Sequence, residues 1–254
     1  MSTPILEVSN LSKAYGGVQA VQDVSFVLNA GELLALIGPN GAGKTTCFNM
    51  LMGQIKPDSG VIRLKGNDIT GRPPQRIWRM GVGRTFQITA TFTSMTVREN
   101  VQMALINHQH ASRRWWKPAA ATDVAHADAL LGRVGMAEQG DRACSVLAYG
   151  DLKRVELAVA LANDPDLLLM DEPTAGMAPK ERIELMQLAA DIVSERGIGV
   201  LFTEHDMDVV FAHAHRIMVL NRGCLLAEGA PKSVRANAQV REIYLGSTVR
   251  AEVE

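Results

Sequence analysis

The stretch Leu33-Leu-Ala-Leu-Ile-Gly38-Pro-Asn-Gly-Ala-Gly43-Lys44-Thr45 joins a short apolar run to a glycine-rich loop that ends in Lys-Thr. The loop fills the pattern G-x-x-x-x-G-K-[ST], and residues 45–52 beyond it have a helical pattern. Its glycines allow successive backbone N–H groups to converge on phosphate oxygens at the positive end of that helix. Lys44 would reach the terminal phosphates, and Thr45 would offer its hydroxyl to Mg²⁺. A plain glycine-rich turn is the alternative, but the flanking strand and helix favour binding of a nucleoside triphosphate.

Short runs of leucine and β-branched residues alternate with helical stretches along the rest of the chain, which predicts a parallel sheet covered by helices. The clearest predicted strands are residues 33–37, 167–170, 199–203 and 216–220. Residues 5–8, 24–28 and 61–64 are punctuated by turn signals and predict an antiparallel sheet beside that core. The expected fold class is therefore α/β, a phosphate-loop NTPase core with an antiparallel β subdomain.

Residues 97–106, 123–134 and 151–162 show apolar recurrence near 3.6 residues and predict an inserted helical subdomain over about 95–163. Asn221-Arg-Gly223 joins two apolar runs and predicts a hairpin, and Pro231 is placed to open a helix. We expect one domain over residues 1–254, with a C-terminal helical extension over about 230–254.

Composition narrows the possible partners. The 26 Lys and Arg residues against 27 Asp and Glu leave no positive excess for a nucleic-acid backbone, so we expect no nucleic acid. The three cysteines are far apart and lack metal-ligand spacing, which predicts reduced thiols and no structural metal. For Cys47, a buried packing role is favoured over oxidation-sensitive regulation. No apolar run of about 18 residues occurs, so membrane work would require docking on another protein.

Two acids, Asp171 and Glu172, follow the predicted strand 167–170, at the edge of an open α/β sheet where ligands bind. Asp171 suits the magnesium shell and Glu172 suits a water-orienting base. The alternative is that the two acids are ordinary surface residues after a strand. The phosphate loop predicted in the same sheet favours the functional interpretation. By themselves Gln87 and His205 would be taken as a polar loop residue and a hydrogen-bonded structural histidine.

With these motifs in order over residues 5–246, the chain resembles the ATP-binding cassette (ABC) subunits of membrane transporters. The resemblance implies ATP and Mg²⁺ as cofactors, with Glu172 as the catalytic carboxylate and His205 as the γ-phosphate sensor. It implies Gln87 as a catalytic, coupling and magnesium contact beside the magnesium ligands Thr45 and Asp171, and Tyr15 as the ring stacked on adenine. The implied phosphate-loop contacts are Gly38, Pro39, Asn40, Gly41, Ala42, Gly43, Lys44, Thr45 and Thr46.

The family's Leu-Ser-Gly-Gly-Gln segment, which contacts the partner subunit's nucleotide, corresponds here to Leu147, Ala148, Tyr149, Gly150 and Asp151. Ala148 lacks the serine hydroxyl, at a cost of about 1.5–3 kcal/mol for a hydrogen bond to a charged group. Asp151 is expected to cap a helix over 152–162 rather than repel the phosphate. After the two acids, Ala175-Gly-Met-Ala178 lacks the family's usual aspartate, which places cross-talk between the two nucleotide sites in doubt.

These departures, together with Glu204-His-Asp-Met207 and the closing Ile243-Tyr-Leu-Gly246, resemble the branched-chain amino acid importer ATPases. That resemblance implies a second ATP-binding subunit, two integral permease subunits and, indirectly, a solute-binding protein. Ala148 and Asp151 favour a different chain as the second ATP-binding subunit, and a homodimer is the alternative. It also implies a peripheral position on the cytoplasmic face of the inner membrane. A related amide or urea importer is the first alternative. A non-transport cassette protein and a phosphate-loop kinase are the others.

Overall fold

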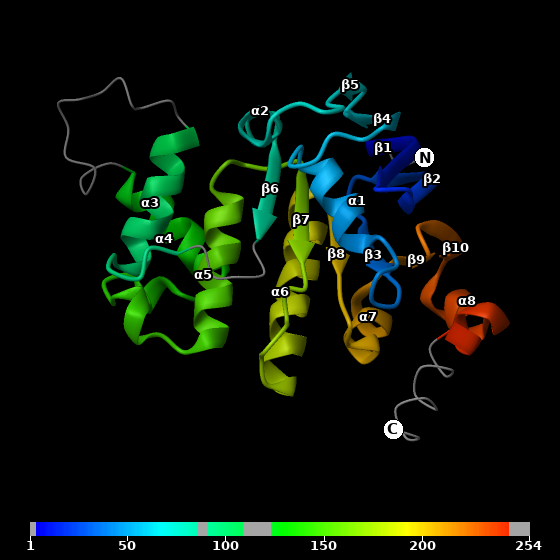
Figure 1. Cartoon of the computed structure of the whole chain (residues 1–254). Coiled ribbons are helices and arrows are strands. Elements are labelled where there is room, and N and C mark those ends of the chain that lie inside the picture. Colours follow the sequence, from blue (N-terminus) through cyan, green and yellow to red (C-terminus); the bar gives the residue numbers. More distant parts are fainter. Residues whose placement is uncertain (1–3, 86–90, 109–122, 244–254) are drawn as a thin grey trace.

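The computed structural model describes residues 4–85, 91–108 and 123–243. Two sheets form its frame (Figure 1). Strands β1 (Pro4–Tyr15), β2 (Val18–Asn29), β4 (Ser59–Leu64) and β5 (Asn67–Asp68) form an antiparallel sheet in the order β2-β1-β4-β5. The predicted antiparallel sheet beside the core is therefore confirmed.

The second sheet has six strands and carries the phosphate loop. Its order is β10-β9-β3-β8-β7-β6, and all neighbours are parallel except the β9–β10 hairpin. The strands are β3 (Leu33–Ile37), β6 (Val82–Thr85), β7 (Leu167–Asp171), β8 (Gly199–Thr203), β9 (Arg216–Asn221) and β10 (Cys224–Gly229). The α/β fold class is thus confirmed, although β6 was not predicted, since Gly83 and Arg84 interrupt its apolar character.

Eight α-helices are present in the described part of the chain: α1 (Lys44–Leu51), α2 (Pro74–Arg79), α3 (Val97–His108), α4 (Val124–Arg133), α5 (Tyr149–Leu161), α6 (Pro179–Arg196), α7 (Met207–His213) and α8 (Pro231–Ala236). Figure 1 shows α3, α4 and α5 grouped at the β6 edge of the large sheet, on the side away from the small sheet. Two 3₁₀ turns, Ala137–Gln139 and Cys144–Val146, connect α4 to α5. Pro231 does open α8, as expected. None of the helices in the described ranges is both long enough and apolar enough to cross a bilayer.

The large sheet separates two cores because successive side chains of a strand point to opposite faces. On β3, Leu34 and Leu36 pack with α1 and the small sheet, in a core that includes Phe48. The alternating residues Leu33 and Ile37 pack on the other face, with residues of α3 to α7. Every residue of β3 is buried, which explains why this strand reads as a continuous apolar run. The loop after β3 is therefore held by a strand that is fixed on both faces.

Candidate nucleotide site and the face opposite it

The phosphate loop follows β3 and enters α1 through Gly43, whose φ of 104° lies in the left-handed region. A methyl group on Gly43 would lie 2.3 Å from the carbonyl oxygen of Ala20 in β2, and one on Gly38 would lie 2.3 Å from that of Leu220 in β9. Both contacts are with backbone, which cannot move aside easily. The two glycines therefore let the loop approach its neighbouring strands closely enough to form a cradle of backbone N–H groups.

Lys44 folds back over this loop. Its Nζ donates hydrogen bonds to the carbonyl oxygens of Gly38, at 2.6 Å, and Pro39, at 3.2 Å. The residue is only 8% exposed, and burial lowers the pKa of Lys44, while the charges of Glu172 and Asp171 act in the opposite direction. The ammonium group thus lies inside the loop and electrostatically near the two acids, where added phosphate charge would stabilise it.

Asp171 ends β7 and is buried, with one carboxylate oxygen held by its neighbour strand. Thr203 in β8 donates a hydrogen bond from its Oγ1 to Asp171 Oδ1, at 2.7 Å. This leaves the other carboxylate oxygen, together with the exposed Thr45 at the start of α1, as oxygen donors of the kind that Mg²⁺ prefers. The residues present therefore fit a magnesium ion.

Glu172 adopts a left-handed φ of 49°, which is uncommon for a non-glycine residue. Its N–H is held by both the carbonyl oxygen and Oγ1 of Thr203, at 3.2 and 3.0 Å. Its carboxylate oxygen Oε1 lies 2.9 Å from Nε2 of His205, whose side chain is 51% exposed. The strained backbone is thus fixed by β8, and two of the three predicted catalytic side chains, Glu172 and His205, are brought together.

Glu204 lies immediately before His205 and holds the loop that follows Glu172. It is only 5% exposed, and its Oε1 accepts hydrogen bonds from the N–H and the hydroxyl of Thr174, at 2.9 and 2.6 Å. Its Oε2 accepts from the N–H of His205, at 3.1 Å. Glu204 was not predicted as a functional residue; the signal available was an acid directly after the predicted strand 199–203.

Arg182 in α6 makes a second connection between the same two segments. Its guanidinium donates to the carbonyl oxygen of Met177 and to Asp206 Oδ2, at 2.8 and 2.7 Å. The hydrogen bond from Arg182 is the largest influence that lowers the pKa of Asp206, whose other oxygen caps the start of α7. Loop 173–178 and the His205 turn therefore form one connected unit.

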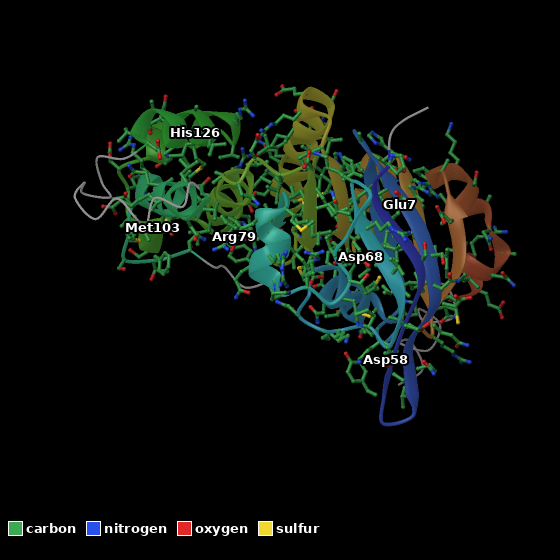
Figure 2. The ribbon with its side chains drawn as sticks, turned by 90° about the horizontal axis from the view of Figure 1, so that it is seen from above. Glu7, Asp58, Asp68, Arg79, Met103 and His126 are labelled. Atoms are coloured by element: carbon green, nitrogen blue, oxygen red, sulfur yellow. The ribbon has the colours of Figure 1, made fainter. Side chains whose placement is uncertain are left out.

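Tyr15 lies at the tip of the β1–β2 hairpin and is 46% exposed, so one face of its ring is open to a stacking partner. The ammonium of Lys13 lies 5.7 Å from the ring centroid and 2.6 Å from Asp58 Oδ1. Asp58 also accepts the N–H of Ala14, at 2.8 Å, which fixes the hairpin next to Tyr15. Figure 2 shows Asp58 beside the projecting β1–β2 hairpin. These contacts, together with the close approach of Ala20 to Gly43, join the hairpin to the phosphate loop.

The segment Leu147–Asp151 lies at the start of α5 rather than before it. The helix begins at Tyr149 with Ala148 as its N-cap residue, and no side-chain cap is made. The prediction that Asp151 caps a helix beginning at 152 is therefore wrong. The helix starts three residues earlier, and Asp151 lies in its first turn, where a negative charge still suits the helix dipole.

This segment is distant in topology from the chain's own phosphate loop. Helix α5 contacts β6 at one edge of the large sheet, whereas the phosphate loop follows β3, with β8 and β7 in between. Its Ala148 and Tyr149 are exposed. The structure thus gives the chain two faces, a candidate nucleotide site at its phosphate loop and a second face formed by Leu147–Asp151.

Gln87 and the closing residues 244–246 lie outside the described residues. Thr85, the last described residue of β6, is buried and lies across a small cavity from α5. Cys47 is fully buried in α1 beneath the phosphate loop, and burial raises the pKa of its thiol to about 12, which favours the packing role.

A larger groove, of about 710 Å³, lies between α2, α3 and α5. Its apolar lining includes Trp78, Phe92, Met103 and Val159, and Arg79 and Arg84 are its basic residues. Figure 2 shows Arg79 and Met103 on the two neighbouring helices that border it. Phe92 is 59% exposed, which is unusual for so large an apolar side chain.

A phosphate loop after β3, a buried and a partly exposed acid at the end of β7 and a histidine after β8 define a phosphate-loop ATPase with a separate face at α5. Comparison with known proteins agrees, because the profile described as "ABC transporter" matches residues 21–175. The chain belongs to the ABC transporter family and is an ABC-type ATPase.

Similar proteins share nearly the whole chain. The high-affinity branched-chain amino acid transport ATP-binding protein LivG of Salmonella typhimurium is 42% identical, over 97% of this chain and 99% of its own. A crystal structure titled as the ADP conformation of an ATP-binding cassette of an ABC transporter is 31% identical, with a TM-score of 0.87, and covers 96% of this chain and 100% of its own. A structure of a dimeric cassette bound to ADP and Pi is 25% identical, with a TM-score of 0.74, and covers 89% of this chain and 98% of its own. Residues 224–249 match a profile described as "Branched-chain amino acid ATP-binding cassette transporter".

Proposed function

We propose that this chain hydrolyses ATP to energise the import of branched-chain amino acids. The observation that carries the substrate class is the 42% identity to a branched-chain amino acid transport ATP-binding protein, and the separate match over residues 224–249 supports it. The pocket geometry supports the ATPase step. An amide or urea importer of similar sequence is the alternative.

In the proposed site the loop amides and Lys44 hold the β- and γ-phosphates, with Gly38, Pro39, Asn40, Gly41, Ala42, Gly43 and Thr46 completing the cradle. Mg²⁺, held by Thr45, Asp171 and Gln87, would neutralise phosphate charge. Glu172 orients the attacking water and accepts its proton, and His205, now on the Glu172 carboxylate, steadies that group and the γ-phosphate. Tyr15 stacks on adenine.

Two ATP-binding subunits enclose the nucleotides in this proposal, and residues 1–254 act as one ATP-binding domain. The dimeric cassette with ADP and Pi, which shares this fold, supports such an arrangement. Each subunit offers Leu147, Ala148, Tyr149, Gly150 and Asp151 to the other's nucleotide. Because Ala148 lacks a hydroxyl, the partner is a different ATPase that carries the serine. Isolation of a transport-competent complex in which both ATPases are copies of this chain would contradict the hetero-pairing.

The groove between α2, α3 and α5 is the proposed seat of a cytoplasmic helix from a permease subunit. Its exposed Phe92 and Met103 suit the apolar face of an amphipathic helix, and the basic Arg79 suits an acid on that helix. The groove adjoins Arg84 in β6, the strand that Gln87 follows in the sequence. This contact would place the chain on the cytoplasmic face of the membrane, and two permease subunits and a solute-binding protein complete the importer.

Uptake by the assembled importer tests the proposal. Vesicles that contain the permeases, both ATPases and the solute-binding protein should accumulate labelled leucine only with ATP, and Lys44→Ala in this chain should abolish both uptake and its share of ATP hydrolysis. Uptake of urea or a short amide in place of leucine would show that the chain serves an amide or urea importer. ATP-dependent phosphorylation of a small acceptor without uptake would indicate a kinase.

A further inference from the structure

Tyr149 occupies a position where the family pattern has glycine, and its ring is in contact with the loop that follows the catalytic carboxylate. A methyl group placed on Gly176 would lie 3.4 Å from the nearest carbon of the Tyr149 ring. Gly176 has a φ of 78°, which holds the loop in a conformation that glycine adopts most readily. The Tyr149 ring therefore lies beside Gly176, at the distance where it would contact a methyl group at that position, and it remains 41% exposed itself.

Gly150 makes a second contact between the same two segments. A methyl group on Gly150 would lie 2.9 Å from Oε1 of Glu181, in the first turn of α6. Oε2 of that carboxylate accepts the N–H of Ala178, at 3.1 Å, and so caps the helix that follows the loop. The start of α5 and residues 176–181 are thus in contact at two consecutive positions.

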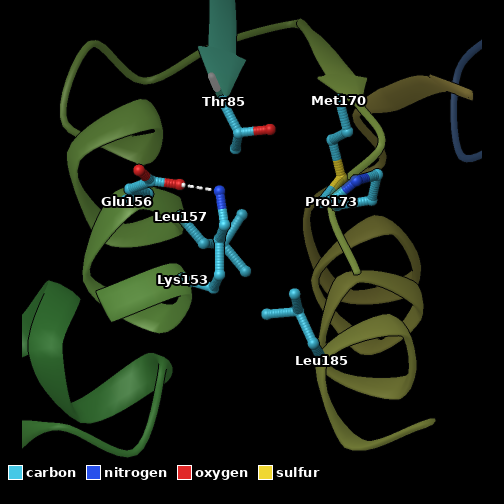
Figure 3. Close-up of a pocket in the computed structure, with 7 residues that line it drawn as sticks. All are labelled: Thr85, Lys153, Glu156, Leu157, Met170, Pro173 and Leu185. Carbon is cyan, nitrogen blue, oxygen red and sulfur yellow. Dashed lines mark hydrogen bonds and ion pairs between the residues drawn. The ribbon is translucent and has the colours of Figure 1, made fainter. Parts of the chain in front are cut away.

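A buried ion pair fixes the α5 side of this junction. Lys153 and Glu156 are 3.0 Å apart with side chains 3% and 4% exposed, and Lys153 Nζ also lies 5.4 Å from the Tyr149 ring centroid. Figure 3 shows the pair facing Thr85 and Pro173 across a small cavity. Both residues belong to α5, so the ion pair balances charge within the buried face of this helix, where an unpaired charge would be costly.

The loop itself leads to the catalytic pair. Thr174 is held by Glu204, the carboxylate of Glu204 also holds the N–H of His205, and His205 lies on Glu172. A continuous set of contacts within one chain therefore joins Tyr149 to Glu172. Its members are packed or hydrogen-bonded groups, the kind of connection that carries coupling between sites.

We propose that Tyr149 is a positioning residue that couples the state of this chain's own catalytic loop to the segment it offers to the partner's nucleotide. The inference rests on the proposed function, since it requires that Leu147–Asp151 face a second ATP site. In this proposal the Tyr149 ring positions the loop at Gly176 of its own chain. In this way the two sites stay coupled although Ala178 replaces the family's aspartate.

The test is ATP hydrolysis by the complete importer over a range of ATP concentrations. Tyr149→Ala should lower kcat about tenfold, the size expected for a packed coupling contact, and leave the KM for ATP nearly unchanged. Tyr149→Phe keeps the ring and should recover most of that loss. Val146→Ala, at an apolar position three residues upstream that is 62% exposed, is the control for simple loss of surface bulk.

A double-mutant cycle with Gly176→Ala identifies the partner of the ring. If Tyr149 acts through Gly176, the kcat of the double variant should be no lower than that of the worse single variant. The backbone strain caused by Gly176→Ala is the same in the single and the double variant, so it cancels in the comparison. Additive losses, a raised KM with kcat intact, or normal turnover by Tyr149→Ala would each overturn the proposal. If Tyr149→Ala does not assemble, Tyr149→Met takes its place in the cycle. Failure of the unmodified importer to hydrolyse ATP or take up leucine would instead contradict the proposed function.

Discussion

The chain's own nucleotide pocket and the face at the start of α5 are built in different ways. The pocket consists of a backbone cradle, the buried Lys44 and two acids fixed by Thr203. The α5 face lacks a side-chain cap at Ala148, and it is held in place by contacts to loop 173–178 and by a buried ion pair. Each motif of the nucleotide site is a short run of sequence at a strand end, whereas the second face lies against residues 176–181, which are distant from it along the chain. Substitutions in the nucleotide site and in the α5 face should therefore have different effects.

The largest effect is expected in the pocket itself. Glu172→Gln keeps the shape of the side chain but removes the base, so turnover should fall by about 10²–10⁴-fold while ATP still binds. ATP binding to the purified chain and phosphate release by the complex measure the two quantities. Near-normal phosphate release by the complex would mean that another group orients the water.

A comparable loss, in stability rather than turnover, is expected behind the second face. Lys153→Met leaves Glu156 buried without this ammonium and should lower the free energy of unfolding by about 3–5 kcal/mol. The double variant Lys153→Met with Glu156→Leu should regain most of this loss. Denaturant unfolding of the three proteins provides the comparison, and an equal loss in both variants would show that the ion pair is not the cause.

Thr203→Val tests how β8 supports the pocket. The change preserves shape but removes the hydroxyl that donates to Asp171 and accepts from Glu172. Since partners of metal ligands typically contribute 10–100-fold, the Mg²⁺ concentration needed for half-maximal hydrolysis should rise by about that factor. ATP binding without Mg²⁺ should change little. If the Mg²⁺ dependence of hydrolysis is unaltered, the assignment of Asp171 as a magnesium ligand is wrong.

Ala148→Ser should strengthen the contact between the Leu147–Asp151 segment and the partner's nucleotide. The added hydroxyl lies at the exposed start of α5 and can donate to the partner's γ-phosphate, so the KM of the importer for ATP should fall by about tenfold or more. The same change should not alter ATP binding to the isolated chain, whose own pocket lies elsewhere. A change in the isolated chain alone would contradict the division into two faces.

The smallest effect concerns the connection between the two regions. Asp206 has a lowered pKa in the folded chain, so its pairing with Arg182 contributes stability above the ordinary carboxyl pKa and loses it as pH falls through the lowered value. Arg182→Met should therefore cost at most about 1 kcal/mol near pH 7, because the pair is partly exposed. The difference from the parent protein should vanish in acid. Thermal unfolding between pH 3 and 7 would show it, and a difference that grows in acid would contradict this assignment.

The pocket was largely predictable because its chemistry is local in sequence. A glycine loop after an apolar run, and two acids after another, identify strand ends that a parallel sheet brings to one edge. Strand β6 was missed because its four residues show neither an apolar run nor alternation. The Asp151 cap was predicted wrongly, since propensity favours Asp at an N-cap, while Tyr149 and Gly150 pack on Gly176 and Glu181, which lie far along the chain. Glu204 and Arg182 were not identified, because their partners are likewise set by tertiary contacts.

Cys47 and Cys144 are buried and Cys224 in β10 is exposed, so the three thiols differ in their access to reagents. Because thiolate is the reactive form, the raised pKa of Cys47 keeps the thiol beneath the phosphate loop inert even in mildly alkaline buffer. A maleimide dye should therefore attach at Cys224 alone under native conditions, without any engineered cysteine. The protein thus carries a natural single-site label position on the hairpin edge of its large sheet, suitable for following subunit association by fluorescence.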